Sequence, residues 1–160
     1  MGAERPIRVL FVCMGNICRS PMAEALFRHQ VAAAGLSERF VIDSAGTGGW
    51  HTGAEPHAGT LAVLARHGVD PGPQRARQLG AEDFGASDYI VAMDGENLRD
   101  LGDLRRAGSA HVSLLLDHAP TLGTREVPDP FYSGGFEHVY RLVDAGCTGL
   151  LAHIREREAL

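Results

Sequence analysis

A short, almost continuous apolar run near the N-terminus constrains the fold more than any other feature of the sequence. The run covers residues 7–12, between Pro6 and a turn that contains glycine. Strands buried on both faces of a parallel sheet have this pattern, because neither face meets solvent. Ser20 and Pro21 then predict the start of a helix. The segment is therefore predicted to be a strand, a tight loop and a helix.

The alternation continues along the chain. After the first helix we expect strands over residues 39–43, 88–93 and 110–116. Helices are expected over 56–67, after a capping Asp94, and along a last apolar stripe from Phe136 to Ile154. Loops are expected over 44–53 and 117–133. Alternating strands and helices without repeats predict an α/β fold with a doubly wound sheet, and 160 residues favour a single domain over 1–160. Such sheets bind ligands beyond the carboxyl ends of their strands.

Composition excludes several function classes. The formal net charge is −5 with mixed signs along the chain, so we expect neither nucleic acid nor an anionic membrane as a partner. The chain has no lysine, so any side chain that clamps a phosphate must be an arginine. Three cysteines and the lack of a long apolar segment predict a reducing, cytoplasmic location, with export without a recognisable signal left open.

The loop after the first strand carries the candidate chemistry. Cys13 and Arg19 are separated by five residues, a spacing that chance alone can produce, so its context matters. Because the loop joins a strand to a helix N-terminus, its N–H groups can surround an anion. The same field stabilises a thiolate, which makes Cys13 a candidate nucleophile, and Ser20 can donate a hydrogen bond to it.

Other residues of the loop fit phosphate binding. The guanidinium of Arg19 can hold two phosphoryl oxygens at once. Gly15 permits close approach of the backbone, and Asn16 tolerates a left-handed conformation. The alternative is a buried structural cysteine beside a surface arginine.

A phosphatase with an aryl leaving group also needs an acid, because a phenol has a pKa of about 10 and its oxide departs slowly without a proton. Asp129 is the candidate, since Pro128 and Pro130 restrict the backbone on either side of it. An Asp-Pro pair by itself is more often a turn, and that alternative stays open here.

Residues 9–24, Val-Leu-Phe-Val-Cys-Met-Gly-Asn-Ile-Cys-Arg-Ser-Pro-Met-Ala-Glu, resemble the signature of low-molecular-weight protein tyrosine phosphatases. Further landmarks match in order at 43–47, Trp50, 77–78, 88–94 and 129–132. The resemblance implies a four-stranded parallel sheet with helices on both faces. It also implies hydrolysis of protein phosphotyrosine and small aryl phosphates through a phosphocysteine, without metal or cofactor.

The resemblance assigns roles to individual residues. It implies that Asp129 protonates the phenol and then activates water. It implies that Cys18 can form a protective disulfide with Cys13. The phosphate loop and its support comprise Met14, Gly15, Asn16, Ile17, Cys18, Ser20 and Ser44, and the substrate slot comprises Trp50, Phe131 and Tyr132. The expected partners are a phosphotyrosine protein or peptide and inorganic phosphate as product, and we expect a monomer.

Some positions depart from the family pattern. Gln74 stands where a histidine often joins the loop network, which leaves the hydrogen bonding around Ser44 open. Phe131 replaces a frequent tyrosine, while Tyr132 is retained. Trp50 can also be read as a partly buried loop residue, and Cys147 as a core residue. We read the histidines, including His51, His57 and His67, as surface or cap residues without metal-ligand spacing.

Three other functions compete with this reading. A phosphoarginine phosphatase typically has threonine where Ile17 stands and lacks the ring of Tyr132. An arsenate reductase needs further cysteines downstream, and residues 80–100 contain none. A non-catalytic phosphate-binding module would need no acid at Asp129.

Overall fold

The computed structural model describes residues 5–102 and 108–160. The predicted apolar strand lies in the middle of its sheet. This strand, β1, spans Ile7–Cys13 and pairs in parallel with a strand on each side. The sheet has four strands in the order β2-β1-β3-β4, where β2 is Phe40–Gly46, β3 is Tyr89–Ala92 and β4 is His111–Leu114. All three pairings are parallel, which confirms the predicted doubly wound sheet.

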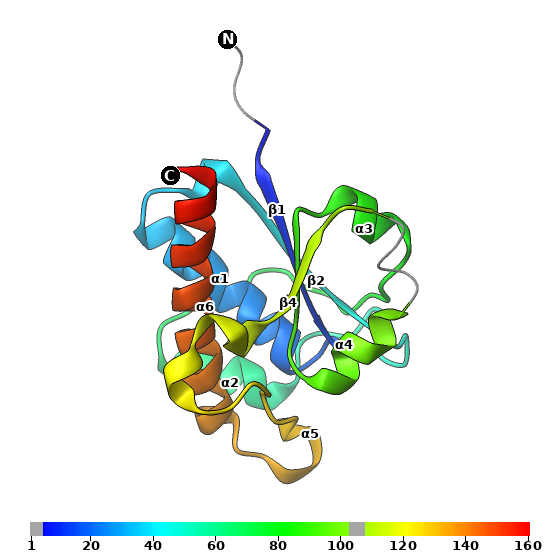
Figure 1. Ribbon diagram of the computed structural model, residues 1–160. Helices are drawn as coiled ribbons and strands as arrows, with labels where there is room; N and C mark the ends of the chain where they lie inside the picture. Colours follow the sequence, from blue (N-terminus) through cyan, green and yellow to red (C-terminus); the bar gives the residue numbers. More distant parts are fainter. Residues whose placement is uncertain (1–4, 103–107) are drawn as a thin grey trace.

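Helices cover both faces of the sheet (Figure 1). Val9 and Phe11 of β1 join the larger core, which holds α1 (Arg19–Ala33), α2 (Ala58–Arg66) and α6 (Phe136–Glu158) on one face. Leu10 and Val12 point the other way, into a smaller core with α3 (Glu82–Ala86) and α4 (Gly95–Leu101). Successive strand residues alternate between faces, so one apolar strand serves both cores.

The second strand is longer than predicted. β2 continues to Gly46, because it stays in register with β1 until Cys13 lies opposite Gly46. The predicted loop therefore begins three residues later than its glycine and serine content indicated. A Cβ atom on Gly46 would lie 2.9 Å from the carbonyl oxygen of Met14, so only glycine lets the two strand ends approach this closely.

The last strand and the segment that follows it also differ from the prediction. β4 ends at Leu114 because the side chain of Asp117 accepts a hydrogen bond from the Leu114 N–H, which starts a 3₁₀ turn over Leu115–His118. Short helices also occupy Pro120–Leu122 and α5 (Pro130–Ser133), where we expected a loop. α3 was not predicted at all. In residues 5–102 and 108–160, no helix is long and apolar enough to cross a membrane.

Candidate active site

The loop between β1 and α1 turns its carbonyl groups away from its own interior. The carbonyl oxygens of Cys13 and Met14 accept from the N–H groups of residues 47 and 48, and those of Ile17 and Cys18 from residues 57 and 22. Because a trans peptide holds C=O and N–H in opposite directions, the N–H groups that follow these carbonyls point toward the inside of the loop. A ring of inward N–H groups is suited to an anion.

Asn16 holds the loop in this shape. Its φ is 56°, the left-handed conformation that asparagine tolerates. The Oδ1 atom accepts a hydrogen bond from the Arg77 N–H at 3.0 Å. The Nδ2 atom donates to Ser20 Oγ at 2.8 Å and to Ser44 Oγ at 3.0 Å. The side chain thus joins the loop, the start of α1 and the end of β2, as the resemblance implied.

Cys13 lies at the end of β1 with its side chain buried, and its sulfur is 3.0 Å from Ser20 Oγ. A hydroxyl has one proton and two lone pairs, and the oxygen of Ser20 already accepts from Asn16. Its proton is therefore available to the sulfur, where it stabilises a thiolate.

Arg19 is held through the Nη1 atom of its guanidinium. Nη1 donates to Asp94 Oδ2 at 2.5 Å and to the Val127 carbonyl at 2.9 Å. The buried Nε has no hydrogen-bond partner among the described residues, and Nη2 lies 3.6 Å from Asp129 Oδ2. Burial by itself lowers the pKa of Arg19, but the negative charges of Cys13 and Asp94 outweigh it and raise the pKa above the usual arginine value. An anchored cation whose Nε has no partner among the described residues, and whose Nη2 makes a long ion pair of 3.6 Å with Asp129, can present this edge to two oxygens of a phosphate.

Asp129 lies across the pocket from the loop. Its Oδ1 accepts from the Phe131 N–H at 3.0 Å and so caps α5, while Oδ2 faces Arg19. The carboxylate is about a third exposed, so it can exchange protons with solvent. An acid that is fixed by a helix cap and open to water can serve in both directions of proton transfer.

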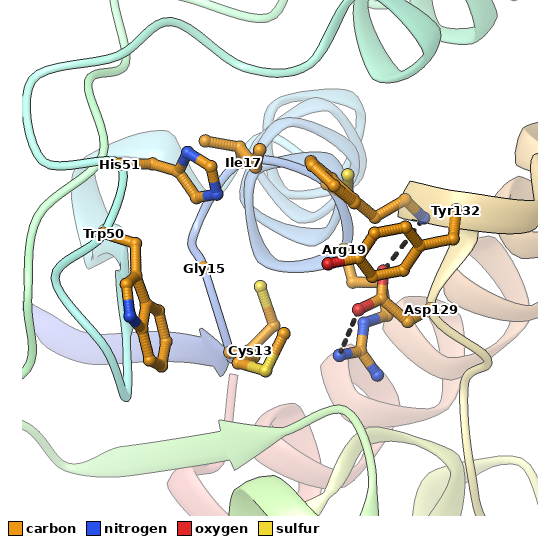
Figure 2. Close-up of a pocket in the computed structure, with 11 residues that line it drawn as sticks. Cys13, Gly15, Ile17, Arg19, Trp50, His51, Asp129 and Tyr132 are labelled. Carbon is orange, nitrogen blue, oxygen red and sulfur yellow. Dashed lines mark hydrogen bonds and ion pairs between the residues drawn. The ribbon is translucent and has the colours of Figure 1, made fainter.

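These side chains line one pocket of about 360 Å³. Figure 2 shows Trp50 on one side of Cys13, with Asp129 and Tyr132 on the opposite side. Trp50 is 71% exposed and Tyr132 is 88% exposed, so both rings can contact a ligand that enters from solvent. The remaining lining residues are Met14, Gly15, Ile17, Cys18, Arg19, His51 and Phe131.

Comparison with known proteins agrees with this geometry. The family model described as "Low molecular weight phosphotyrosine protein phosphatase" matches residues 8–160. The chain belongs to this family. It is 46% identical over 155 residues to the "Low molecular weight protein-tyrosine-phosphatase YfkJ" of Bacillus subtilis, covering 96% of this chain and 99% of that protein. It is 50% identical over 143 residues to a relative from Schizosaccharomyces pombe with the family's name, covering 86% of this chain and 91% of the relative.

Solved structures give the same result. The crystal structure of YfkJ from Bacillus subtilis matches with a TM-score of 0.93 and covers 98% of this chain and 99% of that one. A structure titled "Crystal structure of DARP, drosophila arginine phosphatase" matches at 35% identity with a TM-score of 0.86, covering 93% of this chain and 98% of that one. The same fold thus occurs in a protein named as a tyrosine phosphatase and in one named as an arginine phosphatase.

The two remaining cysteines of this phosphatase differ in position. Cys18 lines the pocket, and burial together with the negative charge of Cys13 raises the pKa of its thiol to about 12. Cys147 is buried on α6 among core residues, and burial raises the pKa of its thiol as well. Both thiols are therefore protonated at neutral pH. The Cys13–Cys18 disulfide stays a prediction, since all three cysteines are free here.

The structure shows which contacts Gln74 makes at the position where the family often has a histidine. Its Nε2 donates to the carbonyls of Pro21 and Pro71 at 3.0 and 2.9 Å, which turns Oε1 toward Ser44 at 3.4 Å. The glutamine therefore keeps a place beside the loop network as a neutral acceptor.

Two active-site features escaped the sequence analysis. His51 was read as a surface or cap residue, but it lines the pocket beside Gly15 and Phe131. Asp94 was expected only to cap α4, which it does through Asn97 N–H, and its other oxygen holds Arg19. His57 and His67, by contrast, lie at the two ends of α2 as expected. No group of three potential metal-ligating His, Cys, Asp or Glu side chains occurs in the described parts of the chain.

Proposed function

We propose that this phosphatase hydrolyses phosphotyrosine in proteins and peptides, with Cys13 as nucleophile, Arg19 as phosphate clamp and Asp129 as general acid and base. The observation that carries the proposal is the buried Arg19 Nε, which has no hydrogen-bond partner among the described residues and lies beside an Nη2 in a 3.6 Å ion pair with Asp129, in the pocket that also holds Cys13. A buried donor without a partner is costly, and a bound phosphate would supply the missing acceptors.

In the first step, the Cys13 sulfur attacks phosphorus and the bond from phosphorus to the phenol oxygen breaks. The inward N–H groups of the loop and Arg19 bind the equatorial oxygens. Protonated Asp129 gives its proton to the departing oxygen, so that tyrosine leaves as a neutral phenol. The products of this step are tyrosine and an S-phosphocysteine.

In the second step, water attacks the phosphocysteine and the sulfur–phosphorus bond breaks. The Asp129 carboxylate takes a proton from that water, and Cys13 leaves as a thiolate stabilised by Ser20. Inorganic phosphate is released, and the enzyme returns to its starting protonation state.

The pocket walls favour an aromatic ester. The exposed rings of Trp50 and Tyr132 lie on opposite sides of the pocket and can both contact a phenyl ring between them. Phosphoarginine is the second candidate, because the matched DARP structure is titled an arginine phosphatase.

The test is hydrolysis of a phosphotyrosine peptide and of a phosphoarginine peptide by the wild type and by Cys13→Ser, with reductant and without added metal. We expect release of phosphate from phosphotyrosine that depends on Cys13. Release from phosphoarginine alone would replace the proposed substrate, and no release from either peptide would reject the enzyme assignment in favour of a phosphate-binding module. Binding of inorganic phosphate by Cys13→Ser serves as the control for an intact loop.

A further inference from the structure

A buried carboxylate outside the pocket is not used by the mechanism above. Glu24 lies on α1 with 5% of its surface exposed. Its Oε1 accepts a hydrogen bond from Ser44 Oγ at 2.7 Å, and its Oε2 accepts from Arg28. A buried charge is retained only with partners such as these, so both oxygens of Glu24 are engaged.

The carboxylate determines the direction of the first hydrogen bond in a series that leads to the nucleophile. Ser44 has one proton, and the ionised Glu24 Oε1 at 2.7 Å takes it in preference to the neutral Gln74 Oε1 at 3.4 Å. The oxygen of Ser44 is then left to accept from Asn16 Nδ2, which also donates to Ser20. Ser20 accepts from Asn16 and has its own proton left for the sulfur of Cys13.

The orientation of the Asn16 amide is determined independently. A backbone N–H can only donate, and the Arg77 N–H points at Asn16 Oδ1 at 3.0 Å. The Nδ2 group must therefore face the two serines. The protons of Ser44 and Asn16 therefore have one direction each, and Ser20 is the donor to Cys13 when the sulfur is a thiolate, because a thiolate can only accept.

We propose that Glu24 is a positioning residue for the reaction: it fixes Ser44 as an acceptor for Asn16 and, through Ser44 and Asn16, strengthens the hydrogen bond from Ser20 to Cys13. The inference rests on the proposed role of Cys13 as nucleophile. Charge on Glu24 polarises each hydroxyl and amide in turn, because linked hydrogen bonds in a buried site strengthen one another. Removal of that charge weakens the last donor, the one that stabilises the thiolate.

Glu24 also lies beside a second hollow at the surface. The residue lines this hollow of about 310 Å³ together with Arg28, Asp43, Gln74 and Arg75. Burial raises the pKa of Glu24, and hydrogen bonds from Arg28 and Ser44 oppose that rise. Gln74 contributes no charge, and Arg28 is a cation in hydrogen-bond contact with this carboxylate.

The test measures thiolate reactivity without substrate. Cys13 is alkylated with iodoacetamide at pH 6 in the wild type, Glu24→Gln, Ser44→Ala and the double variant. We expect Glu24→Gln to slow alkylation about fivefold, the size of one weakened hydrogen bond. Since Glu24 acts through Ser44, the double variant is expected to be no slower than Ser44→Ala alone.

Glu38→Gln provides the matched control, because Glu38 is exposed and the substitution removes the same charge. Urea unfolding of each variant separates loss of stability from loss of reactivity. Unchanged alkylation in Glu24→Gln, or losses that multiply in the double variant, would overturn the inference. A wild type that is alkylated at Cys13 but releases no phosphate from phosphotyrosine would reject the proposed function, and a slower alkylation of Glu24→Gln would then still establish the effect of Glu24 on the reactivity of Cys13.

Discussion

Substitution of Arg19 by lysine isolates the geometry of the guanidinium from its charge. In the structure, Nη1 is occupied by Asp94 and the Val127 carbonyl, Nε has no partner among the described residues, and Nη2 lies 3.6 Å from Asp129, so the Nε–Nη2 edge is the one proposed to bind phosphate. A lysine carries its donors on one atom and lacks a second edge. If its ammonium stays with Asp94, the phosphate loses two hydrogen bonds to a charged group.

The expected loss can be estimated from these contacts. A hydrogen bond to a charged group contributes about 1.5–3 kcal/mol, and the lysine charge recovers part of the two that are lost. A net loss of about 3 kcal/mol corresponds to a decrease of roughly 150-fold in kcat/KM. The assay is hydrolysis of p-nitrophenyl phosphate, with urea unfolding to verify the fold.

Arg125→Lys is the matched control, because Arg125 pairs with Asp117 on the surface and its side chain is 69% exposed. Its kcat/KM is expected to stay at the wild-type value. If Arg19→Lys retained kcat/KM within about twofold, the bidentate edge would have no part in binding the transition state.

Further predictions concern the acid, the thiols and the pH dependence of stability. Asp129→Asn is expected to slow phenyl phosphate about 10²-fold or more and p-nitrophenyl phosphate far less, because the better leaving group needs no proton; equal slowing would remove Asp129 from the role. Iodoacetamide is expected to label Cys13 before Cys18 by peptide mapping, since a pKa of about 12 leaves Cys18 about one thiolate in 10⁴ molecules at pH 8. Inorganic phosphate is expected to protect Cys13, and labelling of Cys18 first would contradict the assignment. Burial and the charge of His153 lower the pKa of His118, so the unfolded chain binds this proton more tightly. The resulting stability is present above about pH 6.5 and is lost as the pH falls below it; His118→Gln is expected to reduce the difference in urea midpoint between pH 7.5 and 5.5, and an unchanged difference would refute it.

The sequence analysis predicted best the features that depend on local pattern. The apolar run of β1 places Cys13 at a strand end, and the helix start after it follows from Ser20 and Pro21. These two elements position the loop, and they belong to a sheet and a family that the structure and the comparison show. Cys147 was correctly predicted in the core, because it lies on the apolar stripe of α6.

The features that were missed depend on contacts between distant residues. Asp94 reaches Arg19 across 75 positions in the chain, and a capping aspartate looks the same in sequence whether or not it does so. His51 enters the pocket because the segment after β2 folds back over Gly15, which no periodicity predicts. α3 has five residues, too few for a helical pattern to be recognised.

The most direct test of the central claim is detection of the covalent intermediate. Wild type and Asp129→Asn are mixed with a phosphotyrosine peptide, quenched rapidly and digested, and the peptide that contains Cys13 is analysed by mass spectrometry. We predict a phosphoryl group on the Cys13 sulfur, and none on Cys18, in the wild type and in Asp129→Asn, where water attack lacks its base. Turnover of phosphotyrosine with no phosphoryl group on Cys13 in either protein would contradict the account.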